Sequence, residues 1–282
     1  MMNESENTRH AAIATTASIA RDLRELGVTA GDTVCVHSGM AALGLVIGGP
    51  RAIVEALMDA VSPGGTVMMP AFSGDLSDPA EWRYPPVPED RYADIREQMP
   101  AYDPARTPTR GLGQVAEYFR TYPGVVRSPH PQSSFTALGP EAETLTLEHP
   151  HDNRFGPESP LGRLIDVGGK VALLGAPHDT VSLFHLTPHL MGAYPAVEKA
   201  APMIEQGERQ WVRYRDIDYP IDWFVAGVAS LVAADIAQVG RVSAAPSILF
   251  PAAEAVAHII DWRRRNGFVP SPPEFKAQVR KI

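Results

Sequence analysis

Histidines follow two apolar runs of the chain, at the points where the runs end. His37 comes directly after residues 33–36, and His178 and His185 follow residues 171–174. A neutral imidazole accepts a proton near neutral pH, so these positions suit a general base. A histidine beside a strand end is also a common structural residue, and the spacing alone leaves both interpretations open.

A metal site is a second interpretation of the same histidines. His185 and His189 are four residues apart, which would place both on one face of a helix, and His178 lies nearby. No glutamate follows either of them in the zinc-protease arrangement, no cysteine supports them, and Pro188 restricts a helix there. We therefore expect no metal. The sequence also lacks a phosphate-binding loop and a Gly-x-Ser-x-Gly nucleophile turn.

The elements that position these residues alternate between short apolar strands and amphipathic helices. The pattern predicts buried strands at 33–36, 66–69 and 171–174, and a more exposed antiparallel strand at 211–219. Helices are predicted at 11–27, 50–61, 111–121, 220–237 and 251–265. This alternation is typical of an α/β protein with a central, mostly parallel or mixed sheet flanked by helices. Ligands of such sheets bind outside the carboxyl ends of the strands, where the histidines lie.

One domain accounts for the length of the chain. We expect residues 11–270 to form it, with a flexible N-terminal tail at 1–10 and a C-terminal tail at 271–282. Residues 73–110 contain seven prolines and little periodicity. Because the strand and helix pattern resumes after them, they are interpreted as an excursion folded over a site and not as a linker.

Composition limits the partners of the protein. The 282 residues carry a formal net charge of −8, which repels nucleic acid and anionic membranes and attracts cations. Cys35 is the only cysteine, which excludes an internal disulfide framework and suits a reducing compartment. With no signal-type segment and no 18-residue apolar run, the sequence predicts a cytoplasmic protein acting on a small cationic molecule.

Short motifs in three groups, in one order along the chain, carry a resemblance to a known family. The first group is His37-Ser38, Leu43-Gly44, Gly48-Gly49, Gly64-Gly65-Thr66 and Met69-Pro70. The second is Pro123-Gly124-Val125, Arg127-Ser128, His130-Pro131, Ser134-Phe135, Gly139, Phe155-Gly156 and Ser159-Pro160. The third is Leu174-Gly175, His178-Asp179, His185-Leu186 and His189. From about residue 14 to residue 265, the chain resembles the aminoglycoside 3-N-acetyltransferase family.

The resemblance implies an acetyl-CoA-dependent N-acetyltransferase, with a fold distinct from the common GNAT fold and with no metal. It implies acetylation of the 3-amino group of the 2-deoxystreptamine ring in an aminoglycoside. Exposed backbone N–H groups at a strand-to-helix turn bind phosphate well without basic side chains. The acetyl-CoA candidates are His37, Ser38, Gly39, Met40, Thr107, Thr109, Gly111 and Gly113.

The resemblance also assigns catalytic roles. His185 corresponds to the general base, and a downstream carboxylate is expected to orient it; Asp218 is slightly favoured over Asp216. Ser182 stands where the family commonly has threonine, and its hydroxyl could assist the tetrahedral intermediate. The same two aspartates could instead be a solvated pair at a strand end.

Substrate contacts are less constrained by the sequence. Where the family often has glutamate and asparagine, this chain has Pro188 and Val181, which weakens the case for a standard aminoglycoside. Acids of the excursion could hold ammonium groups, or could simply keep an exposed loop soluble. The substrate-binding candidates are Asp75, Asp179, His178 and His189.

Other functions stay open at this point. One is N-acylation of another amine in secondary-metabolite biosynthesis, which the changes at Pro188 and Val181 favour. Another is a non-catalytic protein that binds CoA or a ligand, and a metal-dependent hydrolase is a distant fourth. The helix predicted at 220–237 is apolar on most sides, which fits either the core or a homodimer interface.

Overall fold

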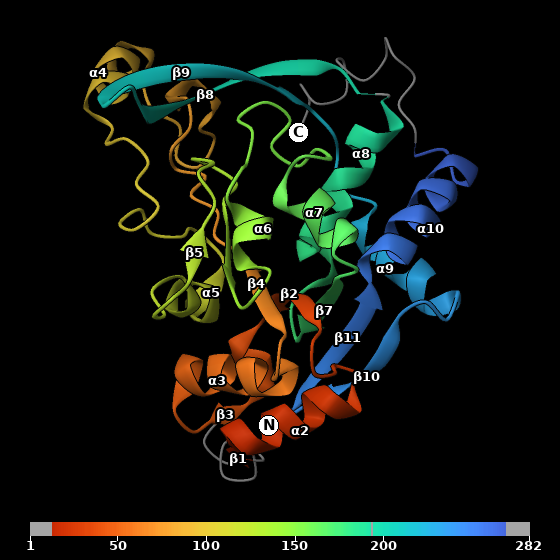
Figure 1. Cartoon of the computed structure of the whole chain (residues 1–282). Coiled ribbons are helices and arrows are strands. Elements are labelled where there is room, and N and C mark those ends of the chain that lie inside the picture. Colours follow the sequence, from red (N-terminus) through yellow and green to blue (C-terminus); the bar gives the residue numbers. More distant parts are fainter. Residues whose placement is uncertain (1–12, 193, 269–282) are drawn as a thin grey trace, which may run out of the picture.

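A seven-stranded mixed sheet forms the centre of the protein (Figure 1). The structure is a computed structural model that describes residues 13–192 and 194–268. Parallel pairing joins β7 (Lys170–Leu174), β2 (Thr33–Ser38) and β4 (Thr66–Pro70), and the outer strands pair antiparallel. The predicted α/β class is therefore correct, and the sheet is mixed. Its strands, in spatial order, are β10 (Gln238–Val242), β11 (Ala245–Pro251), β7 (Lys170–Leu174), β2 (Thr33–Ser38), β4 (Thr66–Pro70), β6 (Phe135–Leu138) and β5 (Val126–Arg127).

Helices cover both faces of this sheet. On one face lie α2 (Thr16–Glu25), α3 (Gly49–Val61) and α5 (Gly113–Arg120). On the other lie α6 (Ala142–Thr146), α7 (Pro160–Asp166), α8 (Leu186–Met191), α9 (Phe224–Ala233) and α10 (Ala252–Arg265). Burial on both faces explains why the parallel strands are continuous apolar runs.

The alternation of side chains along β2 decides where its histidine points. Val34 and Val36 pack with α2 and α3, whereas Cys35 packs in the core beneath α7 to α10. Successive side chains of a strand face opposite sides, so His37 lies on the same side as Cys35. The strand end therefore presents His37 towards the layer that carries His185.

Several predicted boundaries are corrected by the structure. The helix predicted at 11–27 begins at Thr16, because Thr15 caps it through a reciprocal hydrogen bond with Ser18, and Ile13–Ala14 forms a short strand, β1, paired with β3 (Leu45–Val46). Residues 11 and 12, like the predicted tails at 1–10 and 271–282, lie outside the described residues. The helix predicted at 220–237 is shorter, since α9 ends at Ala233 and β10 follows.

The proline-rich excursion at 73–110 has little regular structure, as its composition predicts. It contains three short helices: η3 (Pro79–Glu81), η4 (Glu89–Arg91) and α4 (Tyr92–Gln98). A long hairpin, β8 (Ala196–Glu205) with β9 (Glu208–Ile217), arches over it at the top of Figure 1. The strand predicted at 211–219 is the second half of β9. Within the described ranges no helix is long and apolar enough to cross a membrane.

Candidate active site

A backbone hydrogen bond joins the end of β2 to the end of β7. The Gly39 N–H donates to the Leu174 carbonyl at 2.9 Å, and Met40 begins the short helix η2 (Met40–Leu43). His37 is buried, and its Nε2 accepts a 3.4 Å hydrogen bond from the Ser182 N–H. Burial lowers the pKa of His37 to about 4, so the ring is neutral at working pH. The structure thus brings the predicted residues His37 and Ser182 together.

A glycine is required at position 39 because two backbones meet there. A Cβ built on Gly39 would lie 2.2 Å from the carbonyl oxygen of Gly175 and 2.9 Å from its carbonyl carbon. We expect Gly39→Ala to lower the free energy of unfolding by about 1–3 kcal/mol, because overpacking forces the strand ends apart. Urea unfolding measures this, with Gly74→Ala as the control, since a Cβ on Gly74 meets nothing within 4 Å. Equal stability of the two variants would contradict the close approach.

His185 lies at the end of η6 (Ser182–His185), directly before α8. Its half-buried ring stacks on Phe155, with the ring centroids 4.6 Å apart and an interplanar angle of 13°. Phe224 and Tyr219 pack around the same ring at 5.0 and 5.4 Å. Burial, and then the positive charge of Arg154, lower the pKa of His185 to about 3. A neutral imidazole is the form that accepts a proton.

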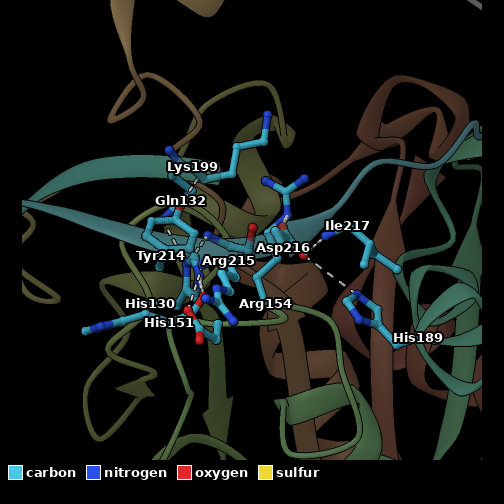
Figure 2. Close-up of polar contacts among 12 residues, drawn as sticks. His130, Gln132, His151, Arg154, His189, Lys199, Tyr214, Arg215, Asp216 and Ile217 are labelled. Carbon is cyan, nitrogen blue, oxygen red and sulfur yellow. Dashed lines mark hydrogen bonds and ion pairs between the residues drawn. The ribbon is translucent and has the colours of Figure 1, made fainter. Parts of the chain in front are cut away.

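Arg154, whose charge acts on His185, forms a buried ion pair with Asp216. Figure 2 shows this pair and His189 beside it. The Arg154 Nε lies 2.7 Å from Asp216 Oδ2, and the His189 Nε2 lies 3.9 Å from Asp216 Oδ1. Burial raises the pKa of Asp216, and Arg154 opposes that shift. Within the described ranges no carboxylate lies at ion-pair distance from a His185 nitrogen. Asp216 therefore contacts Arg154 and faces His189, while Asp218 is exposed, with its N–H bonded to the Pro195 carbonyl at 3.2 Å.

The loop that carries Arg154 and Phe155 is held by buried histidines. Ser128 Oγ and His149 Nδ1 are 2.9 Å apart, and His149 Nε2 lies 2.7 Å from the Arg154 carbonyl oxygen. Because that carbonyl only accepts, Nε2 carries the proton and Nδ1 accepts from Ser128. This network fixes the loop whose next residue stacks on His185.

Other predicted residues gather in a separate place. Thr107, Thr109 and Asp75 line one cavity of about 630 Å³, together with Arg106 and Arg110. Asp75 lies 3.2 Å from Arg110 Nη1 in an exposed ion pair. The predicted turn residues Gly111 and Gly113 follow directly along the chain, both with positive φ, and Gly113 begins α5.

The remaining predicted residues lie in η5 (His178–Thr180), after β7. His178 is half-buried and Asp179 is exposed. No three histidine, cysteine or acidic side chains converge as metal ligands in residues 13–192 and 194–268. Val181 and Pro188, the two departures from the family pattern, are buried in the core.

Comparison with known proteins identifies the family of this chain. The family model described as aminoglycoside 3-N-acetyltransferase matches residues 35–264. The chain belongs to the aminoglycoside 3-N-acetyltransferase family. It is 41% identical to aminoglycoside N(3)-acetyltransferase VIII of Streptomyces fradiae, covering 88% of this chain and 91% of that protein. It is also 41% identical to the acetyltransferase-like protein YokD of Bacillus subtilis, covering 89% of this chain and 93% of YokD.

Solved structures of the family share the whole fold. The structure of aminoglycoside acetyltransferase AAC(3)-Xa superposes with a TM-score of 0.87 at 37% identity, covering 95% of this chain and 98% of that one. The structure of AAC-IIIb, determined with CoASH bound, superposes with a TM-score of 0.82 at 36% identity, covering 93% and 100% of the two chains. The chain is therefore an acetyltransferase with the family's mixed α/β fold.

Three residues at the site were not predicted from the sequence to be functional. Phe155 was noted only as part of a motif, and Arg154 and Tyr219 were not candidates. Arg154 directly precedes the Phe155-Gly156 motif of this aminoglycoside 3-N-acetyltransferase family member, and that adjacency was the available signal. Tyr219 had none, because its proximity to His185 arises only when the end of β9 folds back onto α8.

Proposed function

We propose that the enzyme transfers the acetyl group of acetyl-CoA to the 3-amino group of the 2-deoxystreptamine ring in an aminoglycoside, with His185 as general base. The observation that carries the proposal is the neutral, stacked imidazole of His185 beside the joined ends of β2 and β7. Names of relatives support the reaction, and similar structures hold CoASH and, in AAC-VIa, sisomicin.

The chemistry needs one proton acceptor. The amine lone pair attacks the thioester carbonyl carbon, so a C–N bond forms and the carbonyl electron pair moves to oxygen. His185 takes the proton that the amine nitrogen loses, and collapse of the intermediate breaks the C–S bond. That proton then passes to the departing CoA sulfur. Backbone N–H groups and the Ser182 hydroxyl stabilise the developing oxyanion in this scheme.

Acetyl-CoA binding is assigned to two parts of the chain. One is the His37–Met40 turn, where the Gly39 N–H joins the end of β2 to the Leu174 carbonyl at the end of β7. The other is the cavity of about 630 Å³ lined by Thr107 and Thr109, whose size suits part of a CoA molecule. Arg106 and Arg110 also line it, and they lie in ion pairs with Asp103 and Asp75. Acetyl-CoA would place its thioester near His185, and the reaction would proceed by direct transfer in a ternary complex.

The overall charge favours a cationic acceptor, but the excursion offers few unpaired acids. Asp78 lies 2.7 Å from Arg96, and Glu81 lies 2.8 Å from Lys199. Asp75, Asp179, His178 and His189 remain the proposed substrate contacts. The net charge of −8 attracts a polycation to the surface, and contacts closer to His185 would select its orientation.

Release of CoA from acetyl-CoA, measured with a panel of aminoglycosides, tests this function. We expect turnover with at least one 2-deoxystreptamine compound, and mass spectrometry of the product should show one added acetyl group at the 3-amino position. Acetylation of a different amine, with none of the aminoglycosides consumed, would replace the substrate by a biosynthetic amine. Binding of CoA without transfer to any amine would contradict an enzymatic role.

A further inference from the structure

Polar atoms without partners gather around Arg154. Six buried side-chain nitrogen and oxygen atoms of the described residues lack a hydrogen bond, and five of them belong to one cluster. Proteins seldom leave such atoms unsatisfied, and each exception calls for an explanation such as a bound group. The five atoms are Arg154 Nε, Asp216 Oδ2, His185 Nδ1, His189 Nε2 and Tyr219 OH.

The two atoms of the ion pair in this cluster are close, but they are not aligned for a hydrogen bond. Arg154 Nε and Asp216 Oδ2 are 2.7 Å apart, yet neither atom makes an aligned hydrogen bond. The Arg154 side chain is 25% exposed, whereas that of Asp216 is fully buried. Of the two partners, Arg154 is therefore the one nearer to solvent.

We propose that Arg154 is a specificity-determining residue that occupies, in the free enzyme, the position on Asp216 that a second ammonium group of the acceptor takes. The proposal rests on the function proposed above and adds a subsite to it. Its ligand is a diamine or polyamine in which one amino group reacts at His185 and another is bound as a cation.

The surroundings of Asp216 suit an ammonium group. Asp216 Oδ1 accepts a 2.9 Å hydrogen bond from the Ile217 N–H, whereas Oδ2, beside Arg154, has no hydrogen bond. His189 Nε2 and Tyr219 OH are also buried without partners, and they could accept N–H groups of an ammonium that replaces Arg154 on Oδ2. The ring of Tyr219 contacts both histidines, at 5.4 Å from His185 and 6.1 Å from His189. Tyr219 therefore links the proposed ammonium position to His185.

Displacement has a measurable consequence. A ligand that needs a position occupied by Arg154 binds with an apparent dissociation constant equal to the intrinsic constant divided by the fraction of time that the position is open. Arg154→Met removes the competitor, so calorimetry with sisomicin, in the absence of acetyl-CoA, should give a dissociation constant lower by about tenfold. Cyclohexylamine, which has a single ammonium group, should bind both proteins equally. Arg215→Met is the matched control, because Arg215 is exposed and adjacent to Asp216.

A second measurement uses the unaltered protein, since Arg154→Met leaves a buried carboxylate unpaired and could unfold. The NMR resonance of the Arg154 Nε–H, assigned by its loss in Arg154→Lys, should show faster proton exchange with water once sisomicin is added. Exchange that slows or stays the same would overturn the proposal.

The outcomes separate this inference from the proposed function. If Arg154→Met binds sisomicin no more tightly than the wild type does, displacement of Arg154 is overturned. Acetylation of sisomicin would still support the proposed enzymatic function. If no aminoglycoside binds either protein, the substrate class of the proposed function is wrong and the inference falls with it. Asp216→Asn should weaken sisomicin binding in both the wild type and the Arg154→Met background, and unchanged binding would remove Asp216 from the subsite.

Discussion

His185→Ala is expected to lower kcat for acetyl transfer by at least about 100-fold, as is typical when a general base is removed. Burial and Arg154 lower the pKa of His185 to about 3 in the free protein, so the imidazole is neutral and its nitrogen lone pair is available to the attacking amine. Without it, the attacking amine must release its proton to water. CoA release at saturating acetyl-CoA and sisomicin measures the effect.

The control for this substitution is His258→Ala. His258 lies in α10 and contacts the Ser230 hydroxyl at 3.1 Å, so the same atoms are removed at a half-buried position with no contact to His185. We expect its kcat to stay within about twofold of the wild type, because a substitution away from the site rarely perturbs it. Activity of His185→Ala above a tenth of the wild type, with normal folding, would show that another group takes the proton.

Acidification is expected to unfold the protein at a mildly acidic pH. Burial lowers the pKa of His37 to about 4 and that of His149 to about 3, and it lowers the pKa of His130 well below 6.5. His130 Nδ1 accepts hydrogen bonds from the N–H groups of Gln132 and Ser133, both at 3.1 Å, so protonation there would break both contacts. These histidines are neutral in the folded state.

The sign of the pH effect follows from where the protons bind. Below pH 6.5 the unfolded chain protonates these histidines and the folded protein does not, so the stability present above pH 6.5 is lost as the pH falls. Well below pH 6.5 each histidine contributes about 1.4 kcal/mol per pH unit, so three of them remove about 5 kcal/mol between pH 6.5 and 5. That is comparable with the whole stability of a typical domain, about 5–15 kcal/mol.

Urea unfolding at several pH values checks this expectation. The free energy of unfolding should fall steeply between pH 6.5 and 5, above the range in which carboxylates such as Glu117 begin to protonate. His149→Gln should reduce the slope by about 1.4 kcal/mol per pH unit, because one proton fewer is taken up on unfolding. A slope that is the same in His149→Gln, or a stability that is flat to pH 5, would mean that His149 is charged in the folded state.

Much of the fold follows from local pattern. The strands β2, β4 and β7 are continuous apolar runs because both of their faces are buried, and each was predicted within two residues of its observed ends. β6 and β11 were not predicted, since polar and proline residues interrupt them and only pairing with their neighbours stabilises them as strands. The antiparallel strands that flank the parallel centre of the sheet therefore depended on tertiary structure.

The sequence by itself determined the family, the cofactor class that the family implies, and the position of His185 beyond a strand end, because motifs and strand ends are local features of a chain. Only the tertiary structure decided which groups surround that histidine. Phe155 and Asp216 are 61 residues apart in number, and Arg154 brings them into one cluster because long-range packing closes the loop before α7 against the end of β9. Spacing along a chain cannot encode such contacts, since they depend on how separate elements pack.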